Sequence, residues 1–222
     1  MNPARDLSAW RETIPLVRKA ARGVGLPWGL ADQAAWAASW ISQFGIDGPT
    51  LMANALDGLA EMSLAKVLPQ SSDGAGDWTS RGTWLCPICT GASLADSAIL
   101  LRAEPIRPLA VRTPFALVPF AAAAAWQLEM PVAVDLSGTV IQTDGKDIAI
   151  FGDVSSAVEQ LIVNAEFRLI DQVDQRMIVP KSSQHPAQLE TWRRLTELAR
   201  RNDALALPET AAQPAQPTDL KT

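Results

Sequence analysis

The stretch PVAVDLSGTVIQTDGKDIAIF, residues 131–151, carries the clearest β signal in the chain. Its first part alternates valine with other side chains and predicts a short strand. The runs 139–143 and 146–151 are β-prone and flank Asp144-Gly145, a pair that favours a hairpin because both turn positions need positive φ. The stretch therefore predicts antiparallel strands.

Two shorter segments continue the β signal. Apolar and polar residues alternate over 161–170, which predicts a further strand, although a helix over 157–169 competes with it. Residues 177–179 predict one more short strand.

Helical patterns surround these strands. Apolar residues recur at spacings of three and four, as on one face of a helix. Trp36 and Trp40 are four residues apart and so share one face of their helix. The patterns predict helices at 7–22, 28–44, 50–61, 92–101, 116–128 and 186–201.

The predicted fold class is therefore α+β, with a helical N-terminal layer packed on a mixed part that contains a small, largely antiparallel sheet. Residues 1–205 are expected to form a single globular domain, with a polar loop or seam at 69–82 between the two parts. Residues 206–222 are rich in Ala, Pro, Gln and Thr, and we expect a disordered tail there.

Charge and hydropathy exclude several classes of function. The 222 residues include 19 basic and 24 acidic side chains, and no basic run would attract a nucleic acid. No segment reaches the roughly 20 apolar residues of a membrane span. Residues 1–11 lack an apolar signal core, and two cysteines do not make a secreted disulfide scaffold. The expected location is the cytoplasm.

The chain contains no Tyr and one His, His185. A single histidine excludes a multi-histidine metal centre and paired-histidine acid–base catalysis, and we expect no metal and no cofactor. His185 precedes Pro186 at the start of the last predicted helix. A capping or exposed histidine is the preferred interpretation, and a catalytic base is the alternative.

Cys86-Pro87-Ile88-Cys89 is the most specific local motif. A CxxC pair that leads into a helix can have a lowered pKa at its first thiol, because the helix dipole and free amides stabilise a thiolate. The segment 84–89 resembles a glutaredoxin active site, which implies dithiol redox chemistry. The preferred interpretation is that Cys86 and Cys89 are buried as small apolar side chains.

A polar pair follows the cysteines. On a helix, Ser93 and Asp96 are three residues apart and share a face with Cys89. They are a candidate ligand-binding site, while the solvent face of an amphipathic helix is the competing and preferred interpretation.

Residues 19–32 (KAARGVGLPWGLAD) and 86–96 (CPICTGASLAD) resemble a family of uncharacterised bacterial proteins, common in alphaproteobacteria and described only as a domain of unknown function. The resemblance extends to about Arg201. Residues 17–56 are more faintly similar to the N-terminal helices of type 2 malate/lactate dehydrogenases. The catalytic histidine of that family is absent here, so the similarity implies no site and no cofactor.

Three functional hypotheses follow. The first is a subunit or accessory binding protein in small-molecule metabolism, which would bind a protein partner, a second copy or a small molecule, since a Trp-rich apolar inventory suits an interface. The second is a thiol-dependent oxidoreductase that uses Cys86 and Cys89. The third is an esterase or amidase that uses Cys86 with His185.

Overall fold

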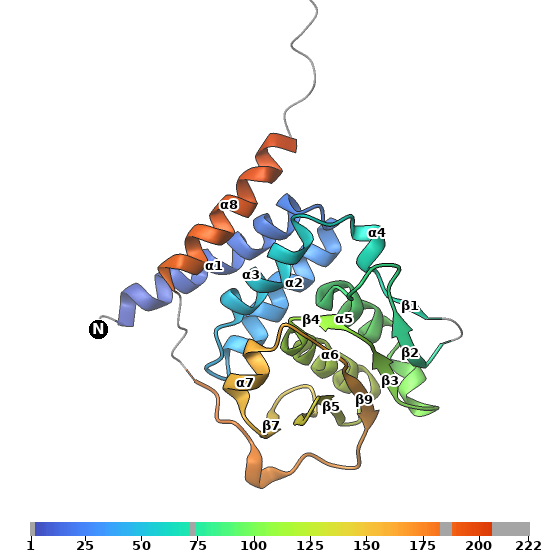
Figure 1. The fold of residues 1–222 in the computed structure, drawn as a ribbon. Coiled ribbons are helices and arrows are strands. Elements are labelled where there is room, and N and C mark those ends of the chain that lie inside the picture. Colours follow the sequence, from blue (N-terminus) through green and yellow to red (C-terminus); the bar gives the residue numbers. More distant parts are fainter. Residues whose placement is uncertain (1–2, 72–73, 183–187, 206–222) are drawn as a thin grey trace, which may run out of the picture.

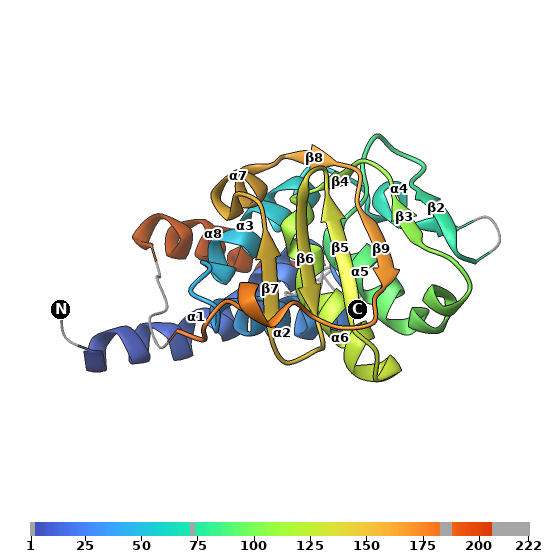
Figure 2. The ribbon, with the colours of Figure 1, turned by 90° about the horizontal axis from the view of Figure 1, so that it is seen from below.

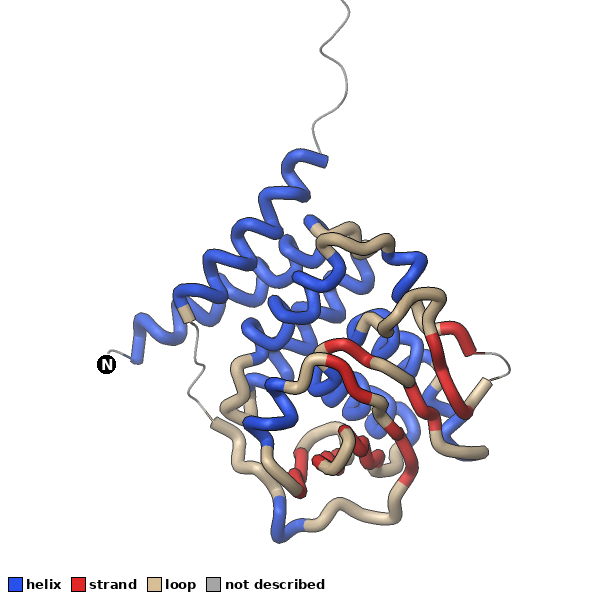
Figure 3. Tube along the Cα trace, viewed as in Figure 1, coloured by secondary structure: helices blue, strands red, loops and turns tan. Residues whose placement is uncertain are grey.

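A computed structural model describes residues 3–71, 74–182 and 188–205. Helices occupy one side of the molecule and strands the other, as Figures 1 and 3 show. The fold class is α+β, as predicted. Within the described ranges, no helix combines the length and the apolarity needed to cross a bilayer.

The helical layer is built from segments at both ends of the described chain. Helix α1 packs against α2 and lies along α8, and α3 packs against all three. Val17 and Ala21 of α1 are fully buried at these contacts, as the amphipathic pattern predicted. The helices of this layer are α1 (Pro3–Gly23), α2 (Trp28–Ser42), α3 (Gly48–Leu59) and α8 (Leu189–Leu205), and the short α4 (Leu64–Val67) follows α3.

The strands form one mixed sheet and a small second one. In the main sheet, the neighbours β2 and β3 run parallel and every other pair is antiparallel. Its order is β1 (Gln70–Ser71), β2 (Gly76–Thr79), β3 (Ile106–Pro108), β9 (Glu166–Leu169), β5 (Val132–Leu136), β6 (Thr139–Thr143) and β7 (Ile148–Phe151). The second sheet pairs β4 (Val111–Arg112) with β8 (Ile162–Val163).

Two turns shape the predicted hairpins. Strands β5 and β6 are joined by Ser137 and Gly138, which both have positive φ, the geometry of a mirror-image two-residue turn. At Asp144-Gly145 only the glycine has positive φ, and the connection from β6 to β7 spans residues 144–147. The Asp144 carboxylate closes this longer turn by accepting the backbone N–H groups of Lys146 and Asp147. The hairpin is confirmed, but the expected two-residue turn is wrong.

Helices α5 (Pro87–Asp96) and α6 (Val118–Leu128) lie between the helical layer and the sheet. Small residues allow the close approach, because α6 contains a run of five alanines and Gly91 of α5 lies directly against the ring of Phe120. Short 3₁₀ segments flank α5 and α6 at Ala98–Arg102 and Pro114–Leu117.

The opposite face of the sheet is crossed by the segment that follows β9, as Figure 2 shows. Its backbone N–H at Asp174 donates to Gln142 Oε1 at 2.9 Å, and Val179 N–H donates to the Ile148 carbonyl at 2.8 Å. The short helix α7 (Val154–Glu159) precedes β8. This segment therefore covers part of the sheet, at β6 and β7, on the face away from α6.

Three sequence-based expectations need correction. The loop at 69–82 contains β1 and β2, because these short polar strands gain their partners within the sheet and not from a local pattern. The sequence patterns predict no strand between the helices at 92–101 and 116–128, yet β3 and β4 lie there. The strand at 177–179 is reduced to a single bridge between Ile178 and Ala149. The preference for strand over helix within 161–170 is confirmed by β8 and β9. The single-domain prediction stays a prediction, and residues 206–222 lie outside the described residues.

Replacing Gly91 by Ala is expected to destabilise the fold, because the added Cβ would overlap the Phe120 ring. Overpacking of this kind costs about 1–3 kcal/mol. Gly29→Ala is the matched control, since Gly29 is also helical and has nothing within 4 Å of an added Cβ. It should be neutral or stabilise by up to about 1 kcal/mol. Urea unfolding of both variants measures the difference, and equal stabilities would contradict the close packing of α5 on α6.

Candidate functional site

A groove of about 480 Å³ lies where α2, α5, α6 and the β6–β7 turn meet. We call it the tryptophan groove. Aromatic side chains form much of its wall: Trp36 and Trp40 from α2, and Phe120 and Trp126 from α6. Its polar lining residues are Gln33, Asp96, Gln127 and Lys146. Four separate parts of the chain therefore contribute to one site.

Two rings of the aromatic wall are buried and the other two are exposed to solvent. Trp40 and Phe120 are buried, whereas Trp36 is 40% exposed and Trp126 is 68% exposed. The Trp36 ring lies 6.5 Å from the Trp40 ring and meets Phe120 edge to face at 6.2 Å, measured between ring centroids. Such aromatic pairs are favourable, so the buried rings hold Trp36 in place while its remaining surface faces the groove.

The two charged groups of the groove form no ion pair among the described residues, although Lys146 lies close enough to Asp144 to help lower the pKa of that carboxyl. The Asp96 carboxylate forms no hydrogen bond and no ion pair there, and the Lys146 ammonium forms no ion pair. Gln33 also lines the groove, and its Oε1 is buried without a hydrogen-bond partner in the described structure. The polar groups of the groove are thus available to a ligand.

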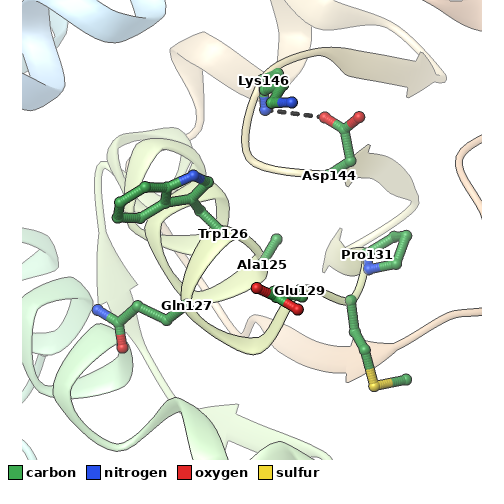
Figure 4. A pocket seen from close by; sticks show the side chains of 8 residues that line it. Ala125, Trp126, Gln127, Glu129, Pro131, Asp144 and Lys146 are labelled. Carbon is green, nitrogen blue, oxygen red and sulfur yellow. Dashed lines mark hydrogen bonds between the residues drawn. The ribbon is translucent and has the colours of Figure 1, made fainter.

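A second hollow of about 620 Å³ adjoins the groove on the other side of Trp126. Figure 4 shows Trp126 standing out from α6 near the turn that carries Asp144 and Lys146. Burial opposes ionisation of Asp144, but hydrogen bonds from the backbone N–H groups of Asp147 and Lys146 outweigh it and lower its pKa. Asp144 is therefore a fixed negative charge in this hollow at neutral pH.

The structure separates the predicted ligand-binding pair. Asp96 is exposed at the last position of α5 and lines the tryptophan groove. Ser93 is half-buried one turn earlier and is not a lining residue. Cys89, expected on the same face, is buried in the core. Of these three residues, the structure brings only Asp96 to the groove.

The two cysteines lie in the core at the start of α5. Cys86 is the N-cap residue and is fully buried, and Cys89 is 3% exposed. Donation of the Cys89 thiol proton to Cys86, together with burial, raises the pKa of Cys89 strongly. Burial opposes ionisation of Cys86, but hydrogen bonds from Cys89 and the backbone N–H groups of Cys89 and Ile88 outweigh it and lower the pKa of Cys86. Cys86 is therefore the more acidic thiol.

His185 is the remaining candidate residue from the sequence, and metal binding is the remaining kind of site. His185 lies outside the described residues, so its role as cap or base stays a prediction. In the part of the chain that the structure describes, no three His, Cys, Asp or Glu side chains gather closely enough to hold a metal ion.

Sequence reasoning missed most of the groove. It paired Trp36 with Trp40 but did not relate them to Trp126 or Lys146, which follow about 90 and 110 residues later. One signal was available: a Trp followed by a Gln at the end of an alanine run places an indole at the rim of an otherwise buried helix. The nearness of the β6–β7 turn to that indole depends on packing and has no local signature.

Both thiols should be protected from alkylation in the native protein. Iodoacetamide at neutral pH should label Cys86 and Cys89 at least roughly a hundredfold more slowly than in the unfolded chain, because labelling requires local opening. The variants Cys86→Ser and Cys89→Ser assign the two rates. Rapid native labelling of Cys86 alone would contradict this and would support a redox site.

Comparisons with known proteins found a single family. No curated protein and no solved structure matched the chain, and the likeness of residues 17–56 to dehydrogenases stays a prediction. The segment that matches this family, residues 11–80, includes helix α2 and therefore Gln33, Trp36 and Trp40 of the groove. Residues 11–80 match the family model described as "Protein of unknown function (DUF3726)", which confirms the predicted resemblance to a domain-of-unknown-function family over residues 19–32, whereas residues 86–96 lie outside the match.

Proposed function

We propose that this protein is a binding protein of small-molecule metabolism, acting as a subunit or accessory protein, and that its ligand occupies the tryptophan groove. One observation supports this most directly: two exposed indole rings from different helices line the same groove of about 480 Å³. Ligand pockets commonly have about 300–1,000 Å³ and apolar, aromatic walls with a few polar groups.

The exposure of Trp126 supports a binding role. The fold gains little from an indole at this position, because 68% of its surface is in contact with solvent. Neighbouring positions of α6 are filled by alanines that pack closely and are almost all buried. A large exposed aromatic surface beside a groove is typical of a contact site for a ligand or partner.

A thiol-dependent oxidoreductase is the second candidate, and the lowered pKa of Cys86 is the observation that favours it. Cys86 lies at the N-cap of α5, where the helix dipole stabilises a thiolate. Complete burial of Cys86 argues against direct reaction with a substrate. The alkylation rates described above decide between the two candidates. The esterase or amidase hypothesis depends on His185, and full activity in a His185→Ala variant would exclude it.

Substitution in the aromatic wall should weaken ligand binding without unfolding the protein. A thermal-shift screen of the full chain against a panel of small metabolites should find compounds that raise its Tm. Trp36→Ala and Trp126→Ala should each weaken binding of these compounds about tenfold or more.

Trp28→Ala is the matched control, because Trp28 is 64% exposed on α2 yet lies beneath the Arg22 guanidinium, 4.7 Å from its ring centroid, and outside the groove. It should leave binding unchanged. The proposal fails if no compound raises the Tm, or if the same compounds stabilise Trp36→Ala and Trp126→Ala as strongly as the wild type.

A further inference from the structure

The walls of the tryptophan groove present aromatic faces. Trp36 and Trp126 are exposed there, and the buried rings of Trp40 and Phe120 hold Trp36 from behind. The face of an aromatic ring carries negative charge, and Trp attracts cations more strongly than Phe or Tyr. The rings that line this groove therefore favour a positively charged ligand group over a neutral one of the same shape.

Asp96 adds negative charge at one wall of the groove. It is the last residue of α5, where the helix carbonyl groups already create a partial negative charge. A carboxylate at this end is unfavourable for the helix, and no basic residue lies in its last turn. Asp96 also has no ion-pair partner among the described residues. A bound cation would stabilise both the carboxylate and the helix end.

Lys146 adds the opposite charge from another wall. It is exposed on the β6–β7 turn, and its position is fixed because its backbone N–H donates to Asp144 at 2.9 Å. Its ammonium attracts the Asp144 carboxylate and helps lower the pKa of that group, but the two groups form no ion pair, so the ammonium can still bind a ligand carboxylate. The groove therefore has an acidic wall from α5 and a basic wall from the turn, with the tryptophan rings as a further part of its lining.

We propose that the tryptophan groove binds a small zwitterion, with an alkylated ammonium group against Trp36, Trp126 and Asp96 and a carboxylate at Lys146. The inference rests on the proposed function and names its ligand class. An alkylated ammonium suits this wall because it presents methyl groups to rings and alanines while keeping its charge. A primary ammonium could donate to Asp96 and to Gln33 Oε1, but it would present its third N–H, and no methyl group, to the rings and alanines.

The decisive experiment compares two molecules of the same shape. Trimethylglycine and 3,3-dimethylbutanoate differ only in whether the central atom of the bulky group is a charged nitrogen or a neutral carbon. Isothermal titration calorimetry on the full chain should show trimethylglycine binding at least about tenfold more tightly, because Lys146 attracts both carboxylates equally and only one molecule carries a cation. Equal affinities would overturn the inference.

Two variants test the two ends of the ligand. Asp96→Asn should weaken trimethylglycine and choline alike, by about fivefold or more. Lys146→Met should weaken trimethylglycine and leave choline unchanged, since choline has no carboxylate. Glu61→Gln is the control, because it removes one exposed carboxylate that does not line the groove and should change neither affinity. Unchanged binding in Asp96→Asn would also overturn the inference.

The failure of this inference is distinguishable from failure of the proposed function. If trimethylglycine and its neutral isostere bind equally and Trp126→Ala abolishes both, the groove is a ligand site that selects shape and not charge. If other compounds raise the Tm of the wild type, but not that of Trp36→Ala or Trp126→Ala, while neither of these two molecules binds, the zwitterion inference is overturned. In that case the groove is still the ligand site. If a Lys- or Arg-containing peptide binds the groove in place of free zwitterions, the occupant is a protein partner and the inference is overturned.

Discussion

Helix α6 is packed closely on two sides, and this packing sets the positions of the elements around it. This helix contacts α5 and α2 on one side and strands β5 and β6 on the other. Its alanine run and Gly91 of α5 bring the helix axes together, and a Cβ at Gly145 would lie 2.8 Å from the Cβ of Trp126 and 3.0 Å from the Ala122 carbonyl oxygen. Protein interiors are close-packed, so these small residues fix where the neighbouring elements lie.

That packing also creates the tryptophan groove. Because α6 is buried along most of its length, its exposed residues Trp126 and Gln127 mark where it reaches the surface. The same end meets the β6–β7 turn, which brings Lys146 to an indole ring. The core and the candidate site are therefore consequences of one arrangement, and the site needs no separate scaffold.

The local elements were largely predictable from the sequence, and their meeting points were not. Periodicity over 161–170 and the β-prone runs in 131–151 predicted strands correctly, since alternation is a local property. Strands β1 and β2 were missed because their stability comes from pairing across the sheet. In the groove, Asp96 was one of the candidates that its helix position suggested, whereas Trp126 and Lys146 line the groove only through tertiary contacts.

Indole NMR can show whether Trp36 and Trp126 form one ligand site. The eight tryptophans give separate ¹⁵N–¹H indole signals that substitution can assign. Addition of trimethylglycine should move the Trp36 and Trp126 signals together, with a common dissociation constant, and leave exposed Trp28 and buried Trp78 unchanged. Unmoved Trp36 and Trp126 signals, or equal movement of Trp28, would contradict the account.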